Sequence, residues 1–299
     1  MRMLPWLLVR LVIVCSIVAI ILLLVSQKQE LTPPQHSREE AKGIDTKSRQ
    51  ALPHPTVQVL GKFPHDAKAF TQGFTIAKHG QDSYFLESTG LYGESTLRFV
   101  EIETGKVLKQ HKLSNEHFGE GLTLGPNDKV VMLTWKSKTG FVFDLDAKGR
   151  NFALQGEFKF KTVTGEGWGI TFDGNNYAVS DGSSIISFWD PTTMTETRHI
   201  DVMTGLGTQK VLYINELEYA KGFIYANVWY QPYILKINPD TGAVVTIFDL
   251  SDIIIDAGVD VNSGAVLNGI AYDKVQDVFY ITGKLWNAVY KIHLIDSVD

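Results

Sequence analysis

The stretch Glu120-Gly121-Leu122-Thr123 decides the fold, because the chain repeats it in altered form four more times. The counterparts are Gln72-Gly73-Phe74-Thr75, Trp168-Gly169-Ile170-Thr171, Asn215-Glu216-Leu217-Glu218 and Asn268-Gly269-Ile270-Ala271. In each run a variable residue opens a short strand-like segment, and the apolar third positions are 48, 48, 47 and 53 residues apart. A period near that length is typical of the blades of a β-propeller.

Two further strand-like runs follow each opening run, and turns rich in Gly then lead into a fourth strand. Four strands repeated five times predict an all-β, five-bladed β-propeller over residues 56–299. The chain ends after the third strand of the fifth blade. Residues 56–60 alternate apolar and polar, so we expect them to supply the missing outer strand and close the ring. A β-sandwich or an open β-repeat is the alternative.

Residues 1–25 form a separate segment that predicts a signal anchor or a signal peptide. The run 11–25 is almost wholly apolar and follows Arg2 and Arg10, and residues 6–25 are enough to span a membrane. The basic flank places the propeller on the non-cytoplasmic side, whether periplasmic, lumenal or extracellular. Residues 23–27 lack a small-residue cleavage site, which favours an uncleaved anchor over a secreted product. Residues 26–55 carry prolines and charges and are predicted to be a disordered tether.

The composition excludes several classes of protein. The 299 residues carry a net charge of −5, so we expect no basic face and no nucleic-acid partner. The chain has one cysteine, Cys15, which rules out an intrachain disulfide and a metal site built from cysteines. His65, His111 and His117 follow no zinc-binding pattern and are expected at the surface. We expect a monomer.

The candidate site follows from the repeat, because the innermost strands of a propeller line its axial channel. The opening residues would then face one another; they are Gln72, Glu120, Trp168, Asn215 and Asn268. A second ring is expected at the ends of the second strands, at Glu87, Trp135, Asp181, Trp229 and Lys284. Taken alone, each residue has an ordinary structural explanation, such as a turn cap or a core indole. Together they predict a Trp-walled pocket for a small polar ligand.

Seven short stretches, in order and at blade spacing, carry a family resemblance. They are Phe70-Thr71-Gln72-Gly73-Phe74, Phe118-Gly119-Glu120-Gly121-Leu122-Thr123, Leu133-Thr134-Trp135, Gly167-Trp168-Gly169, Ile214-Asn215-Glu216-Leu217-Glu218-Tyr219, Asn227-Val228-Trp229 and Thr282-Gly283-Lys284-Leu285-Trp286. The chain thereby resembles the plant-type glutaminyl cyclases, a family also found in bacteria. The resemblance implies a five-bladed propeller enzyme that converts the N-terminal glutamine of peptides or proteins to pyroglutamate (5-oxoproline) and releases ammonia.

The resemblance also implies roles for single residues. Glu120 takes the place of the catalytic carboxylate, and we expect it to shuttle the proton. The pocket positions implied by the resemblance are Phe70, Gln72, Phe118, Trp135, Trp168, Asn215, Trp229 and Lys284, to which the ring register adds Asn268 and Glu87. The amides of Gln72 and Asn215, or the ammonium of Lys284, are the candidates for stabilising the oxyanion. Catalysis is expected to need no cofactor and no metal, while a structural divalent cation elsewhere stays open.

Two other functions compete with this interpretation. A divalent-metal-dependent, lactonase-like propeller hydrolase would hold its ion with oxygens of Glu120, Asn215, Asn268 and Asp181. Trp168 fits that function poorly, because an indole offers no metal ligand. The other alternative is a non-catalytic, peptide-binding propeller. Activity after chelation argues against the hydrolase, and ammonia release from a Gln-leading peptide argues against the binding protein.

Overall fold

The computed structural model describes residues 55–79, 82–145, 151–205 and 207–296, all within one compact unit, Ser48–Asp299. The predicted anchor (1–25) and nearly all of the predicted tether (26–55) lie outside these residues. In the described part of the chain, no helix has the length and apolar character needed to cross a membrane.

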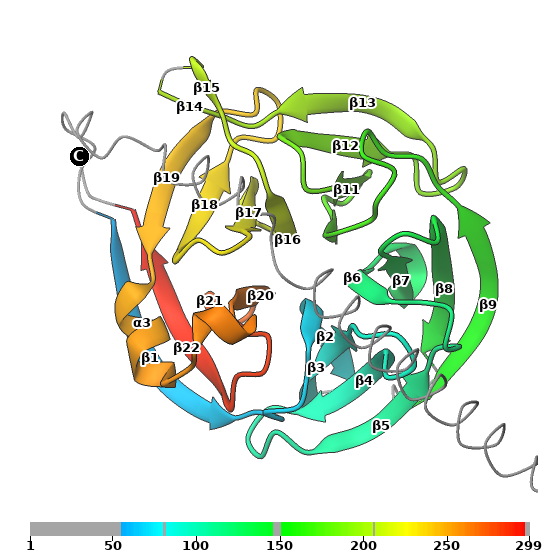
Figure 1. Ribbon diagram of the computed structural model, residues 1–299, viewed down its shortest axis with the longest axis horizontal. Coiled ribbons are helices and arrows are strands. Elements are labelled where there is room, and N and C mark those ends of the chain that lie inside the picture. The colour runs from blue at the N-terminus through cyan, green and yellow to red at the C-terminus, as the bar shows by residue number, and fades with distance from the viewer. Residues whose placement is uncertain (1–54, 80–81, 146–150, 206, 297–299) are drawn as a thin grey trace, which may run out of the picture. The chain divides into compact units, whose positions relative to one another are not determined.

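Five four-stranded antiparallel sheets surround a common axis, and we number them as blades 1 to 5 (Figure 1). Blade 1 contains β2 (Thr71–His79), β3 (Asp82–Thr89), β4 (Thr96–Glu101) and β5 (Val107–Lys112). Blade 2 contains β6 (Gly119–Leu124), β7 (Lys129–Thr134), β8 (Thr139–Leu145) and β9 (Phe152–Lys159). Blade 3 contains β10 (Ile170–Phe172), β11 (Tyr177–Ser180), β12 (Ile185–Trp189) and β13 (Glu196–Asp201).

Blades 4 and 5 complete the ring. Blade 4 contains β16 (Ile214–Ala220), β17 (Phe223–Val228), β18 (Tyr233–Ile237) and β19 (Val244–Asp249). Blade 5 contains β20 (Leu267–Asp273), β21 (Val278–Gly283), β22 (Ala288–Ile295) and β1 (Thr56–Pro64). β1 pairs antiparallel with β22, from Thr56 opposite Ile295 to Pro64 opposite Ala288. The predicted five-bladed propeller and its closure by the N-terminal strand are therefore confirmed.

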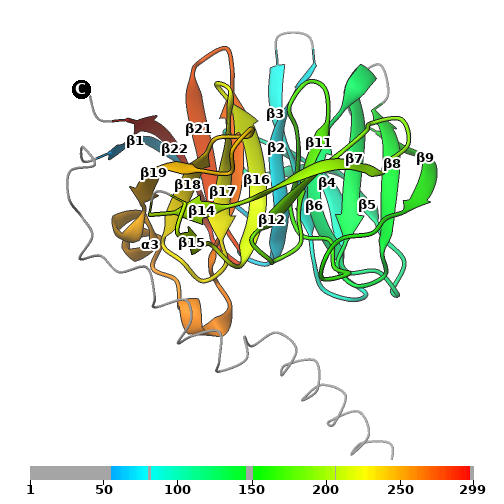
Figure 2. The ribbon, with the colours of Figure 1, turned by 90° about the horizontal axis from the view of Figure 1, so that it is seen from above.

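The innermost strands β2, β6, β10, β16 and β20 contact one another in a closed ring. Seen from the side, strands such as β2 and β16 run nearly along the axis (Figure 2). The same ends of all five strands therefore meet at one end of the ring's axis, which we call the mouth.

Five small elements of the described residues lie outside the regular blades, and the repeat did not predict them. β14 (Met203–Thr204) and β15 (Gln209–Lys210) form a two-stranded sheet between blades 3 and 4. The helix α3 (Ser251–Ala257) follows β19, and its end is marked by Gly258 in the left-handed conformation at φ 65°. Two 3₁₀ turns, η3 (Pro126–Asp128) and η4 (Val261–Ser263), complete the elements of the described residues.

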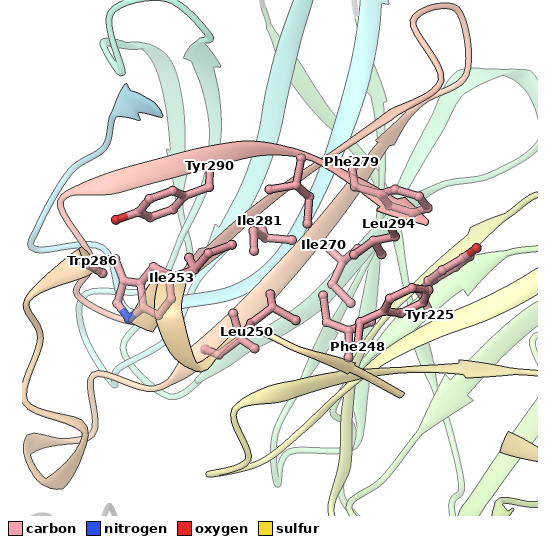
Figure 3. Close-up of a cluster of buried hydrophobic side chains, with 14 of the residues drawn as sticks. Tyr225, Phe248, Leu250, Ile253, Ile270, Phe279, Ile281, Trp286, Tyr290 and Leu294 are labelled. Carbon is pink, nitrogen blue, oxygen red and sulfur yellow. The ribbon is translucent and has the colours of Figure 1, made fainter. Parts of the chain in front are cut away.

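The core consists of apolar layers between neighbouring blades. The layer between blades 4 and 5 is shown in Figure 3, with Tyr225 and Phe248 facing Ile270 and Phe279. Helix α3 buries Ile253 in this layer beside Trp286, which is fully buried and donates its indole N–H to the carbonyl oxygen of Ala265 at 3.2 Å. Such layers hold each blade against the next, so the geometry of the mouth depends on packing all round the ring.

Candidate active site

Four of the five opening residues occupy β-bulges in the innermost strands. Pairing with the second strand is interrupted between Thr71 and Gly73, Gly119 and Leu122, Ile214 and Leu217, and Leu267 and Ile270. The interruptions contain Gln72, Glu120, Asn215 and Asn268. A bulge leaves a residue unpaired and redirects its side chain. The fifth opening residue, Trp168, lies just before β10 and donates its backbone N–H to the carbonyl of Ser180 at 3.1 Å.

The glycine after an opening residue lets neighbouring innermost strands touch. A Cβ on Gly121 would lie 2.5 Å from the carbonyl oxygen of Trp168, and one on Gly169 would lie 2.2 Å from that of Asn215. Real Cβ atoms do not approach backbone this closely, so these positions exclude any larger residue. The contact draws the opening residues of blades 2, 3 and 4 together around the axis.

Blade 4 departs from this rule, because Glu216 occupies the position of the glycine. Its buried carboxyl group accepts the backbone N–H of Phe74 in blade 1 at 3.3 Å and that of Ile270 in blade 5 at 2.9 Å. Burial, together with the nearby Glu218, raises the pKa of Glu216 well above the ordinary value. Glu216 thus links three blades around the axis.

Glu120 and Lys284 are buried ionisable groups of opposite charge type at the mouth. Each is 5% exposed. Burial raises the pKa of Glu120 well above its ordinary value, with Lys284 opposing the shift and Glu166 adding to it. Burial lowers the pKa of Lys284 to about 8, with Glu120 opposing. The pKa values of this acid and this base are therefore shifted toward each other. Proton transfer between them, or to and from a ligand, then costs little free energy.

Two of the carboxamides near Glu120 use their side-chain nitrogens on protein acceptors. Gln72 uses Nε2 to donate to Glu120 Oε1 at 3.0 Å, and Asn268 uses Nδ2 to donate to the carbonyl oxygens of Thr71 and Gln72 at 3.0 and 3.3 Å. The side-chain oxygens of Gln72, Asn215 and Asn268 are buried and find no donor among the described residues. Buried acceptors without donors are costly, so these oxygens suit a ligand that carries N–H groups.

Aromatic side chains form two walls beside these polar groups. Phe118 contacts both Phe70 and Trp135, with ring centroids 6.1 and 5.5 Å apart, and the ammonium of Lys284 lies 4.9 Å from the centre of the Phe70 ring. On the other side, Trp168 and Trp229 pack edge to face at 5.5 Å. Phe118 is 5% exposed and the other four rings are half-buried, so together they can shield one side of a ligand from water.

Glu166 joins the two walls, and the sequence reasoning missed it. Its Oε2 accepts the indole N–H of Trp135 at 2.7 Å and that of Trp168 at 2.9 Å. The only signal in the sequence is its place in Gly165-Glu166-Gly167-Trp168-Gly169, a glycine-rich run directly before an opening residue.

Glu87 has different neighbours from the other predicted site residues. His65 Nε2 lies 2.9 Å from Glu87 Oε1, which also accepts the hydroxyl of Thr71 at 2.7 Å. Burial alone would raise the pKa of Glu87, but His65, Arg98 and Thr71 together outweigh it, so this pKa lies below the ordinary value. His65 is 8% exposed, so the expectation that it lies at the surface was wrong. The pair attaches the segment after β1 to blade 1.

Asp181, at the same register, holds the loop before β10. Its carboxylate accepts the backbone N–H of Thr164 at 2.9 Å and that of Ser183 at 3.0 Å. Within residues 55–79, 82–145, 151–205 and 207–296, no three or more His, Cys, Asp or Glu side chains gather in a way that could hold a metal ion.

Fold and site together define a closed five-bladed propeller whose axial mouth combines the carboxyl group of Glu120, the amine of Lys284, unpaired carboxamide oxygens and indoles. Residues 30–294 match the family described as glutamine cyclotransferase. A glutaminyl-peptide cyclotransferase of Arabidopsis thaliana is 40% identical over 245 residues, which cover 80% of this chain and 71% of that protein. The crystal structure of the glutaminyl cyclase of Myxococcus xanthus superposes with a TM-score of 0.73 at 31% identity, covering 83% of this chain and 100% of that one. The chain therefore belongs to the glutamine cyclotransferase family, and it is an enzyme.

Proposed function

We propose that the chain converts the N-terminal glutamine of peptides or proteins to pyroglutamate, with Glu120 moving the proton. The observation that supports this most strongly is the buried pair of Glu120 and Lys284 beside unpaired carboxamide oxygens and an indole wall. An N-terminal glutamine brings matching groups, namely an amine, a carboxamide and a short flexible stem.

The reaction needs a bent substrate more than a strong catalyst. The α-nitrogen and the γ-carbonyl carbon belong to the same residue, so holding the stem folded brings the reacting atoms into contact. In this pocket the oxygens of Gln72, Asn215 and Asn268 accept substrate N–H groups. The indoles of Trp168 and Trp229 cover the stem and keep water from competing with the α-nitrogen.

Proton movement follows from the two titrating groups. Ionised Glu120 takes a proton from the α-nitrogen as that nitrogen bonds to the γ-carbonyl carbon, which leaves a tetrahedral oxyanion. Glu120 then gives the proton to the side-chain nitrogen, the carbon–nitrogen bond breaks and ammonia leaves. The net change is glutamine to 5-oxoproline plus ammonia, and Glu120 ends as it began. General acid–base catalysis of this kind contributes about 10²–10⁴-fold.

Lys284 is assigned to the oxyanion. The sequence left three candidates open, namely Gln72, Asn215 and Lys284, and of these the Nε2 of Gln72 already donates to Glu120. The protonated amine of Lys284 then offers its hydrogen-bond donors and a positive charge, which a developing oxyanion requires. Asn215 is kept as a substrate-binding group through its free oxygen.

An ammonia-release assay on a peptide of the Gln-Ala type tests the proposal. We expect ammonia from the wild-type chain and pyroglutamyl peptide in equal amount. Because both proton transfers pass through Glu120, we expect the same rate after exhaustive chelation. Loss of activity on chelation would favour the metal-dependent hydrolase, and tight binding of the peptide without ammonia release would favour a non-catalytic binding protein.

We also propose that residues 1–25 anchor the enzyme in a membrane, with the catalytic domain on the non-cytoplasmic side. The apolar run 11–25 behind Arg2 and Arg10 supports this placement. Extraction of membranes with alkaline carbonate tests it. We expect the full chain to stay with the membrane and a chain that starts at residue 26 to be released.

A further inference from the structure

Glu166 occupies the one position where the two aromatic walls of the mouth meet. The first wall runs from Phe70 through Phe118 to Trp135, and the second consists of Trp168 and Trp229. No ring contact is recorded between Trp135 and Trp168, although both indoles donate to the same oxygen, Oε2 of Glu166. One carboxylate thus replaces the missing ring contact.

The loop that carries Glu166 is itself held in place. The backbone N–H of Glu166 donates to the hydroxyl of Thr164 at 3.2 Å, and its carbonyl oxygen accepts the hydroxyl of Thr162 at 2.7 Å. Thr164 in turn donates through its backbone N–H to Asp181 in the loop after β11. Glu166 therefore presents its carboxylate from a fixed backbone, as a positioning group must.

The carboxylate also acts on the proton shuttle. Two charged side chains influence Glu120: Lys284 pulls its pKa down, and Glu166 pushes it up. A negative charge near a buried carboxyl group disfavours ionisation, so Glu166 and Lys284 oppose each other at the reacting group.

We infer that Glu166 is a positioning residue for the cyclisation: it holds the indoles of Trp135 and Trp168, which come from neighbouring blades, in one wall. This inference deepens the proposed function and rests on it. Glu166 acts through the indoles and through its field, and it exchanges no proton with the substrate.

Two substitutions separate the two effects. Glu166→Gln removes the charge but keeps a carbonyl oxygen that accepts an indole N–H, whereas Glu166→Ala removes both. We expect the plateau value of kcat/KM, above the rising limb of the pH profile, to fall in both variants, with a further loss of about tenfold to a hundredfold in Glu166→Ala, the range of a charge-assisted hydrogen bond. Glu157→Gln, on the exposed face of the outer strand β9, is the matched control and should leave the activity unchanged.

The pH profile reports the charge effect. Ionised Glu120 is the acceptor of the first proton, so kcat/KM rises with pH through the pKa of Glu120. Removing the negative charge of Glu166 lowers that pKa, and the rising limb should move to lower pH in both Glu166 variants but not in Glu157→Gln. If the rising limb of kcat/KM in Glu166→Gln lies at the same pH as in the wild type, Glu166 has no charge effect on Glu120.

The indole proton resonances report the positioning effect without reference to activity. Trp135→Phe and Trp168→Phe identify the two signals, and both should move upfield in Glu166→Ala because the hydrogen bonds are lost. In the double variant Trp135→Phe/Trp168→Phe, which lacks both indole N–H groups, adding Glu166→Ala should reduce activity no more than adding Glu166→Gln. The inference is overturned if the indole resonances do not move. It is also overturned if Glu166→Ala loses the same additional activity, relative to Glu166→Gln, in the wild-type chain and in the double variant. A wild-type chain that releases no ammonia would instead overturn the proposed function, and the resonance test would still stand.

Discussion

Replacing Glu120 with Gln removes the proton shuttle while it keeps the size and the hydrogen-bond acceptor of the side chain. The carbonyl oxygen of the new residue still accepts the Nε2 of Gln72, as Oε1 of Glu120 does at 3.0 Å. Substrate binding should therefore change little. The amide cannot take the proton of the α-nitrogen, so kcat should fall by about 10²–10⁴-fold. That loss corresponds to about 3–5 kcal/mol of activation free energy, at 1.36 kcal/mol for each factor of ten.

The same substitution should increase stability at neutral and alkaline pH. The pKa of Glu120 is raised in the folded chain, so between the ordinary pKa and this raised value the folded state keeps a proton that the unfolded state has lost. Stability therefore falls as pH rises through this window. Glu120→Gln has no such loss. The melting temperature of the variant should exceed that of the wild type, and by more at pH 8 than at pH 5.

Two measurements check this prediction. A coupled ammonia assay on a Gln-Ala-type peptide gives kcat and KM, and thermal unfolding at several pH values gives the stability difference. The exposed Glu157→Gln serves as the control for both. A folded Glu120→Gln variant with wild-type kcat would refute the assignment of the shuttle. A stability difference that is the same at pH 5 and pH 8 would refute the raised pKa.

Three further predictions concern Lys284, Glu218 and Gly121. Lys284→Met should lower kcat/KM by about 10²–10³-fold, the cost of an oxyanion donor. It should also abolish the loss of activity above pH about 8 that follows deprotonation of Lys284. A wild-type pH profile in this variant would contradict the role. Burial raises the pKa of Glu218 to about 8, so the wild type should lose folding stability as pH rises from the ordinary pKa of a glutamate to pH 8. In unfolding experiments at several pH values, Glu218→Gln should make this pH dependence of stability weaker. An unchanged pH dependence would contradict the raised pKa. Gly121→Ala should lower the free energy of unfolding by about 1–3 kcal/mol, because the new Cβ would lie 2.5 Å from the carbonyl oxygen of Trp168. Gly156→Ala is the control, since a Cβ there meets open space. Equal denaturation midpoints of the two variants would refute the clash.

The repeat predicted the propeller correctly because blade formation is a local property. Each strand, hairpin turn and blade involves residues within about one period of each other, so the pattern is visible along the chain. The closure also followed from the sequence, since a blade with three strands at one end requires a fourth from the other end. β1 pairs with β22 as the alternation in residues 56–60 predicted.

The partners of the site residues could not be predicted in the same way. Glu87 and Glu120 were both predicted to lie at the mouth, yet Glu87 pairs with His65 while Glu120 accepts a hydrogen bond from Gln72. The choice depends on which side chain the neighbouring blade presents. Glu166 was missed for the same reason, because its role exists only where indoles of two blades converge on one oxygen.

By itself, the amino-acid sequence determined the number of blades, the way the ring closes, the ring of opening residues and the family resemblance, since all of these depend on spacing along the chain. Only the tertiary structure decided which carboxamide N–H groups are already engaged, how far burial shifts the pKa values of Glu120 and Lys284, and that Glu216 and Glu166 join different blades. Hydrogen bonding and desolvation depend on the distances between groups in space, and around this axis those groups come from blades that lie far apart in the sequence.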